Sequence, residues 1–151
     1  MVDDVQLSRL RKIINLRPSD WVLLVEALIL TATIRLALSL CSFRKLLTWV
    51  EGAADERPRR TPSGDEVRRV AWAVSVASRF VMAATCLTQA LAAKYILDKR
   101  GISSTLRMGM AKAGPATIEG HAWLECEGEI VLGGGDLDRY AEMLAWHGKQ
   151  R

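Results

Sequence analysis

The spacing of apolar residues changes once along this chain, near residue 101, and that change restricts the folds that the chain can adopt. Ahead of it, apolar side chains recur every three or four residues, as in amphipathic helices: Val67, Val70, Val74, Ala77 and Val81. Behind it, residues 105–112 alternate Leu106, Met108 and Met110 with other residues, which is typical of a strand. We therefore predict an α+β fold, with helices first and a small antiparallel sheet after them.

Two helices are expected directly before the change, over residues 66–82 and 86–100. Thr85 is a suitable N-cap for the second helix, and Gly101 is a suitable stop. This helix is apolar on nearly all sides, which predicts a central position in the fold. Lys94 falls in its later turns, where a cation suits the negative end of the helix dipole.

Residues 21–41 form an almost continuous apolar stretch, long enough to span a membrane. Glu26 and Arg35 interrupt it, and each charge would cost roughly 2.5–3.5 kcal/mol at the centre of a bilayer. With residues 18–20 as a plausible start, we predict a long core helix wrapped by other helices; membrane association is the alternative. Residues 42–50 predict a second, shorter helix.

The region after the strand at 105–112 predicts a turn at 113–118 and then a hairpin. The hairpin strands are residues 121–126 and 129–132, joined at Glu127-Gly128. Residues 136–146 (DLDRYAEMLAW) are expected to form a closing helix.

The chain is expected to divide into three parts. Residues 1–50 form an N-terminal helical region, residues 51–65 (EGAADERPRRTPSGD) a linker rich in charge and turn formers, and residues 66–151 the core domain.

The positive charge of the chain is not concentrated in one region. The formal net charge is +4 over 151 residues, with no basic or acidic tail. The densest basic run is Arg57, Arg59 and Arg60 in the linker, which we interpret as solvated. Nucleic-acid binding usually needs a clustered basic face, so we expect no nucleic-acid partner.

The three cysteines, Cys41, Cys86 and Cys126, follow no regular spacing. An odd number argues against a disulfide framework, and residues 1–16 hold five charges and no apolar signal core. We therefore expect a cytoplasmic protein. The two histidines lie far from any paired cysteines, so we expect no zinc site and no cofactor.

Two residues have positions that suit nucleophilic chemistry. Cys86 stands at the start of a helix, where free N–H groups and the dipole stabilise a thiolate; burial as a small apolar residue is the alternative. His121 opens a strand and shares a sheet face with Trp123 and Glu125. It is a candidate base, and simple packing is the alternative.

Hairpin register suggests a third group. If Glu127-Gly128 is the turn, His121 lies opposite Gly134. Asp136, two residues later, would then project to the same sheet face as His121. Its carboxylate could hold the imidazole in one tautomer while His121 activates Cys86. The alternative for Asp136 is a helix N-cap, and Asp138 is the next acid along the chain.

An ordered set of short motifs extends this interpretation: Cys86-Leu87 at a helix start, Arg100-Gly101-Ile102, Leu106-Arg107, and residues 121–125 (HAWLE). Together with the apolar N-terminal helix, the set resembles the transglutaminase-like cysteine proteases of lasso-peptide biosynthesis. The resemblance implies a papain/transglutaminase-like core and a Cys-His-Asp triad, with Cys86 as nucleophile and His121 as base. Family members place the acid at the end of the next strand, which here is 133–135 (GGG), so Asp136 and Asp138 are the nearest candidates.

The resemblance also implies a function. Such proteases remove the leader peptide from a ribosomally made precursor and free the core amine for macrolactam closure by a separate cyclase of the asparagine-synthetase type. A separate RiPP recognition element protein delivers the precursor, and no cofactor is needed. The alternatives are an acyl-transferring transglutaminase-like enzyme and a non-enzymatic scaffold. Residues 43–50 include Phe43, Leu46, Leu47, Trp49 and Val50, which could form an apolar docking face for the recognition protein or could pack on the long helix.

Overall fold

The computed structural model describes residues 17–52 and 58–147. Its helices are α2 (Pro18–Leu40), α3 (Phe43–Gly52), α4 (Gly64–Ala77) and α5 (Cys86–Lys99), with short 3₁₀ helices η1 (Ser78–Phe80) and η2 (Leu137–Arg139). The strands are β1 (Thr105–Lys112), β2 (Ile118–Cys126), β3 (Glu129–Leu132) and β4 (Ala141–Trp146). The predicted α+β class is confirmed.

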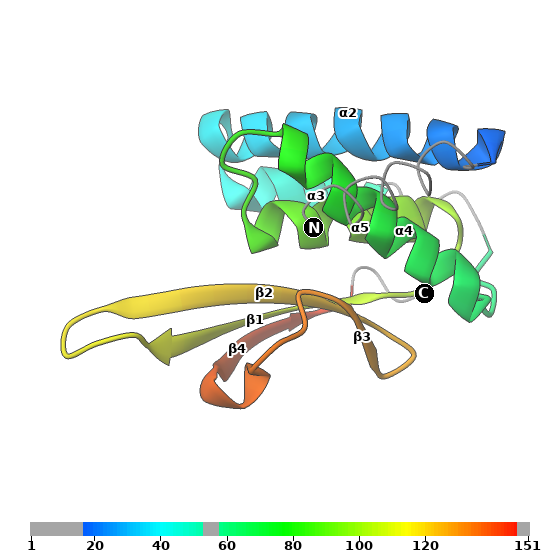
Figure 1. Cartoon of the computed structure of the whole chain (residues 1–151). Coiled ribbons are helices and arrows are strands. Elements are labelled where there is room, and N and C mark those ends of the chain that lie inside the picture. The colour runs from blue at the N-terminus through cyan, green and yellow to red at the C-terminus, as the bar shows by residue number, and fades with distance from the viewer. Residues whose placement is uncertain (1–16, 53–57, 148–151) are drawn as a thin grey trace, which may run out of the picture.

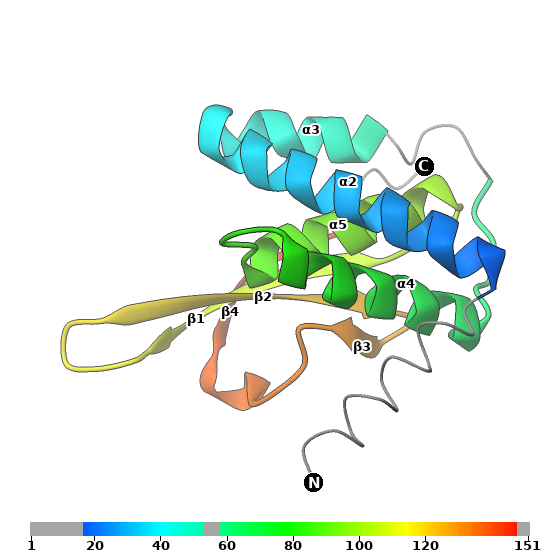
Figure 2. The ribbon, with the colours of Figure 1, turned by 45° about the horizontal axis from the view of Figure 1, so that its top comes forward.

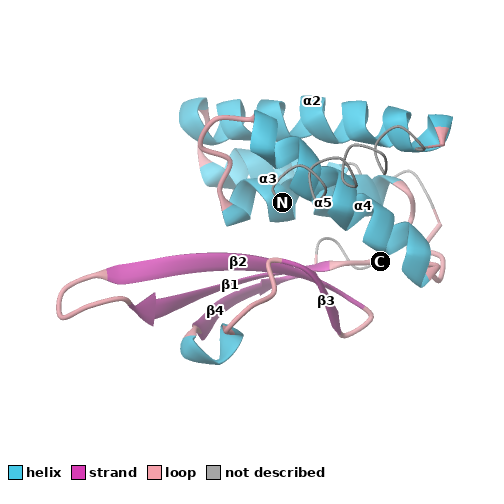
Figure 3. Cartoon of the chain, in the orientation of Figure 1, coloured by secondary structure: helices cyan, strands magenta, loops and turns pink. Residues whose placement is uncertain are grey.

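The four strands form one sheet in the order β3-β2-β1-β4, with every neighbouring pair antiparallel. The helices cover one face of this sheet (Figure 1; Figure 3). Helix α5 packs directly on the sheet, and α2 lies on the far side of α4 and α5 from it. The hairpin of β1 and β2 extends past the helices in both views of the ribbon (Figure 2).

Local signals explain why α5 begins and ends where it does. The Thr85 side chain accepts a hydrogen bond from the backbone N–H of Thr88, as expected of an N-cap. At the other end, Gly101 has φ +75°, the left-handed conformation that glycine adopts most readily. The predicted start and stop of this helix are confirmed, and Cys86 is its first residue.

One hydrophobic core joins the helices to the sheet. It includes Leu23 and Ile34 from α2, Leu91 and Ile96 from α5, and Leu124 from β2. Side chains from both sides of the linker therefore share this core. The predicted helix over residues 66–82 is present as α4 and then η1.

The expected wrapping of the long helix α2 by other helices is wrong. Only one stripe of it is buried, formed by Leu23, Ala27, Leu30, Thr31 and Ile34. Large apolar side chains on its other sides are exposed: Trp21, Val22, Val25, Leu28, Ile29, Leu36 and Leu40. Among the described residues, α2 is the one helix that is long and apolar enough to cross a membrane, by length and composition alone.

The expected closing helix over residues 136–146 is also wrong. These residues form η2 and then β4, which pairs with the edge of β1 that β2 leaves free. Pairing satisfies the backbone groups along that edge, and this tertiary gain outweighs a local pattern that resembles a helix. Gly109 permits the close approach of β4, because a Cβ there would lie 3.0 Å from the Ala141 carbonyl oxygen and from the Tyr140 Cβ.

Candidate active site

A pocket of about 330 Å³ lies between the start of α5 and the sheet. Cys86 and His121 both line it. Three methionines make much of its wall apolar. The full lining is Thr85, Cys86, Leu87, Met108, Gly109, Met110, Gly120, His121, Ala122 and Met143. Cys86 and His121, the predicted nucleophile and base, therefore line one cavity although they lie 35 positions apart in the sequence.

Cys86 has the setting that a nucleophilic thiol requires. It is half-buried at the first position of α5, next to the Thr85 cap, where the N–H groups of the first turn point out of the helix. A thiolate at this place is stabilised by those groups and by the helix dipole.

The other two cysteines differ from Cys86. The Cys126 thiol is buried, donates a hydrogen bond to the Ser103 carbonyl over 3.3 Å, and has a pKa raised chiefly by burial. Burial therefore favours the protonated, unreactive form of Cys126. Cys41 is exposed at the end of α2, outside the pocket.

The His121 ring is held by a backbone carbonyl. Its Nε2 lies 2.8 Å from the carbonyl oxygen of Gly133. An imidazole that donates from Nε2 carries its lone pair on Nδ1, so Nδ1 is the atom that can accept a proton. No hydrogen bond joins the Cys86 thiol to this ring in the described part of the chain. Such contacts often tighten only when substrate is bound.

Gly133 is required for this arrangement. Its φ is +75°, and a Cβ on it would lie 2.6 Å from the Ala122 carbonyl oxygen and 3.0 Å from the Trp123 Cα. A side chain would therefore both strain the backbone and push it away from β2. The glycine lets the chain pass close to β2 and present its carbonyl to His121.

Two aromatic rings stack on the imidazole. The centroid of the Tyr140 ring is 5.1 Å from that of His121, and the centroid of the Trp123 ring is 6.3 Å away. The pKa of Tyr140 is raised, first by burial, then by its hydrogen bond to Glu119, with a smaller contribution from Cys86. Tyr140 therefore packs against the candidate base.

The sequence alone does not identify Tyr140 or Gly133 as site residues. Its local pattern predicts a closing helix at Tyr140 and only the end of a strand at Gly133. The signal that could have identified Tyr140 is the alternation of residues 140–146, which also fits a strand.

Asp136 and Asp138 are both exposed, and neither side chain makes a hydrogen bond or ion pair in the described part of the chain. The turn at Glu127-Gly128 is confirmed, with Cys126 paired to Glu129, but a register shift between Leu124 and Glu125 follows, and β3 ends at Leu132. The alternation of sheet faces along the hairpin therefore does not determine on which face Asp136 lies. Asp136 precedes η2 without a side-chain cap, and its part in a triad stays a prediction.

The two candidate partners of His121 can be separated by mutation. We expect Gly133→Ala to lower kcat about 10²-fold, because displacement of the carbonyl frees the ring to turn. If the Gly133 carbonyl alone orients His121, Asp136→Asn and Asp138→Asn should keep rates within about threefold of wild type. The measurement is the rate of peptide cleavage, with circular dichroism to confirm folding. A tenfold or greater loss confined to Asp136→Asn would make its carboxylate the third member of the triad.

The described residues contain no group of three or more His, Cys, Asp or Glu side chains suited to a metal ion. The groups present suit acyl transfer through a thiolate, with an imidazole as proton carrier. The Gly133 carbonyl is the group that holds the orientation of the imidazole.

Comparison with known proteins agrees with this chemistry. A family model described as "Transglutaminase-like superfamily" matches residues 30–145, which include the whole pocket. No curated protein and no solved structure gives a significant match.

Proposed function

The chain belongs to the transglutaminase-like superfamily, and from that premise we propose that it is a cysteine endopeptidase that removes the leader peptide from a lasso-peptide precursor. Members of this superfamily are usually cysteine-dependent enzymes. The observation that carries the proposal is that Cys86, at a capped helix start, lines the same pocket as His121, whose ring is held through Nε2. The finer assignment to leader removal rests on the motif resemblance.

The proposed reaction has two halves. In the first, the Cys86 sulfur attacks the last leader carbonyl, its proton passes to His121 Nδ1, and the Cys86 backbone N–H helps to bind the oxyanion. His121 then gives that proton to the leaving amine as the C–N bond breaks, and a thioester remains. In the second half, water deprotonated by His121 attacks the thioester, which releases the leader carboxylate and restores the thiol.

The shape of the pocket suits an apolar substrate side chain near the bond that is cut. Met108, Met110 and Met143 line it, and methionine adapts its shape to what it contacts. Met110 and Met143 are largely exposed, so these side chains can move as substrate enters.

The partners that we propose are the leader peptide, a separate RiPP recognition element protein and the lasso cyclase, all in the cytoplasm. The expected docking face on α3 is smaller than predicted, because Leu46 and Val50 are buried in the core. Trp49 remains 44% exposed and stacks on Tyr95 with ring centroids 4.8 Å apart. Docking of the recognition protein at Trp49 is retained as a proposal.

The second candidate is acyl transfer to an amine, with which the superfamily assignment is equally compatible. It would use the same cysteine, histidine and oxyanion site, and it differs only in the acceptor for the thioester. A scaffold without catalysis is the remaining alternative, and it predicts an inert Cys86.

Alkylation distinguishes an enzyme from a scaffold. Treatment with iodoacetamide at neutral pH should label Cys86 faster than Cys126, because a buried thiol with a raised pKa reacts slowly. Loss of precursor cleavage should follow Cys86 labelling in proportion. Peptide mapping by mass spectrometry gives the order of labelling, and Cys41→Ser removes the signal of the exposed third thiol. A Cys86 that stays unlabelled while Cys126 reacts would favour the scaffold.

A further inference from the structure

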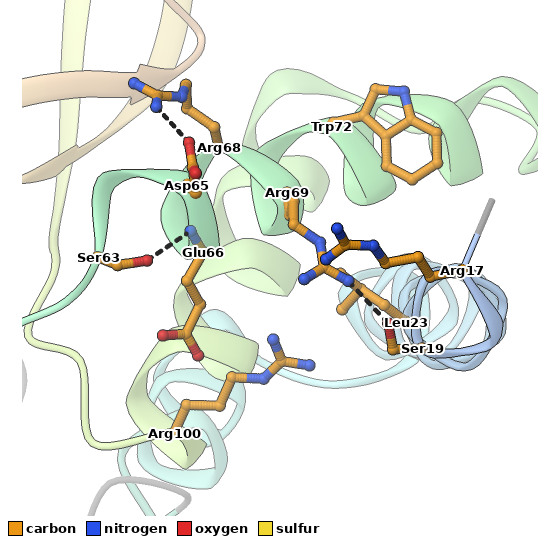
Figure 4. A pocket seen from close by; sticks show the side chains of 10 residues that line it. All are labelled: Arg17, Ser19, Leu23, Ser63, Asp65, Glu66, Arg68, Arg69, Trp72 and Arg100. Atoms are coloured by element: carbon orange, nitrogen blue, oxygen red, sulfur yellow. Dashed lines mark hydrogen bonds and ion pairs between the residues drawn. The ribbon is translucent and has the colours of Figure 1, made fainter. Parts of the chain in front are cut away.

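A second cavity lies where α4 begins and α2 begins (Figure 4). Its volume is about 770 Å³. Four arginines and two carboxylates line it, together with an indole; the full set is Arg17, Ser19, Leu23, Ser63, Asp65, Glu66, Arg68, Arg69, Trp72 and Arg100. We call this cavity the basic cleft. An adjoining hollow of about 270 Å³ shares Arg17, Arg69 and Trp72 with it.

The guanidinium groups of Arg17, Arg69 and Arg100 converge on the same space (Figure 4). Arg69 is paired with Asp20 beside the cleft, and Arg100 reaches Glu26 only at 3.4 Å. No ion pair is found for Arg17 in the described part of the chain. Positive charge in the cleft is therefore only partly neutralised.

Both carboxylates of the cleft already have a cationic partner, one outside the cleft and one within it. The pKa of Glu66 is lowered first by its hydrogen bond from Arg60, which lies outside the lining, and only slightly by Arg69 and Arg100. Asp65 pairs with Arg68 at 2.5 Å in an exposed contact. A ligand with its own carboxylates would find unsatisfied cationic partners here.

The lining indicates the chemistry of that ligand. Arginine forks bind carboxylates with two parallel hydrogen bonds, and Trp72, 36% exposed, offers an apolar face beside them. A peptide can present carboxylates to the arginines and an apolar side chain to Trp72 at the same time. An acidic peptide segment is the ligand that matches.

The cleft is separated from the candidate active site by the length of α5. Arg100 directly follows that helix and Cys86 begins it. Fourteen residues at about 1.5 Å per residue give a separation of roughly 20 Å. An extended peptide covers about 3.3 Å per residue, so roughly six residues would span the gap.

We propose that the basic cleft is an exosite that binds an acidic segment of the peptide substrate, roughly six or more residues from the bond cut at Cys86. This inference rests on the proposed peptidase function. Binding there would raise the concentration of the scissile bond at the pocket and would leave the chemistry unchanged.

The test is fluorescence anisotropy with fluorescein-labelled octaglutamate, and octaglutamine serves as the uncharged control. Wild type should bind octaglutamate at low salt, more weakly as salt rises, and should not bind octaglutamine. Arg17→Glu/Arg100→Glu should weaken binding by roughly tenfold or more. The matched control is Arg44→Glu/Lys112→Glu, which makes the same change in charge at exposed positions outside the cleft and should bind as wild type does.

Two results would overturn the proposal. One is equal loss of binding in both double variants, which would mean that total charge alone attracts the peptide. The other is tighter binding of a labelled oligothymidylate than of octaglutamate. This assay measures binding only, so a lack of octaglutamate binding would reject the exosite and would not bear on the peptidase function. Conversely, a lack of precursor cleavage would reject the peptidase function, and the binding assay would still test the exosite. With a cleavable precursor, the cleft variant should raise KM about tenfold and leave kcat unchanged.

Discussion

Replacement of Cys86 by alanine is expected to abolish precursor cleavage and leave the fold intact. Alanine fills a similar apolar space at the start of α5 but has no group that can attack a carbonyl. In a triad that acts as a unit, loss of the nucleophile costs about 10⁴–10⁶-fold in kcat. The helix start should persist, because the Thr85 side chain supplies the cap.

The matched controls are Cys41→Ala and Cys126→Ala, since the first thiol is exposed and the second is buried, both away from the pocket. Cys41→Ala should keep full activity. Cys126→Ala should keep its kcat and lose some stability, because a buried side chain is shortened. Mass spectrometry measures precursor cleavage by each variant, and thermal unfolding measures its stability. Turnover by Cys86→Ala at the wild-type rate would remove the basis of the peptidase assignment.

The second large effect is expected at a buried ion pair far from the chemistry. Lys94 is fully buried on α5; its Nζ lies 3.1 Å from Asp98 Oδ2, donates to the Ser104 carbonyl at 2.7 Å, and sits 4.9 Å from the Trp146 ring. Burial lowers the pKa of Lys94 and raises the pKa of Asp98, so desolvation opposes both charges. The pair is stable because each charge compensates the other.

Lys94→Met should therefore lower the free energy of unfolding by about 3–5 kcal/mol, because it leaves the Asp98 carboxylate buried without its partner. The melting temperature should fall by on the order of 10 °C. The double variant Lys94→Met/Asp98→Leu should recover most of this loss, since it removes both charges. Urea unfolding of the three proteins measures the effect. A double variant as unstable as the single one would show that packing, and not the unpaired charge, causes the loss.

The single variant should also acquire a pH dependence. Lys94 lowers the pKa of Asp98, so its removal lets that pKa rise further above the value in the unfolded chain. Between those two values the folded state binds more protons than the unfolded state, and the free energy of unfolding falls as pH rises. The stability difference from wild type should thus be smaller at pH 4 than at pH 7. A difference that grows on acidification would contradict this.

The parts of the fold that sequence could predict are those set by neighbours in the chain. The start of α5 follows from Thr85, its end from Gly101, and the hairpin turn from Glu127-Gly128, whose φ angles are +52° and +82°. Each signal lies within a few residues of its effect. The juxtaposition of Cys86 with His121 was predicted from the resemblance and from the order of helix and strand.

The parts that sequence could not predict depend on contacts between distant segments. Strand β4 forms because β1 has a free edge, and nothing within residues 136–146 records that edge. Lys94 looked like a helix-end cation, but Trp146 and the loop at Ser104 enclose it. The bulge at Val131 on β3 shifts the register of the chain after it, and the carbonyl of Gly133 contacts His121, where an unbroken register favours Asp136.

The central claim is that Cys86 transfers the leader acyl group to water. The most direct measurement is mass spectrometry of the precursor after incubation with the protein and its recognition partner in ¹⁸O-labelled water. We predict two products, a leader fragment with one ¹⁸O in its new carboxylate and a core fragment with a free amine. Intact precursor, or a leader fragment joined to an amine without ¹⁸O, would contradict the proposal.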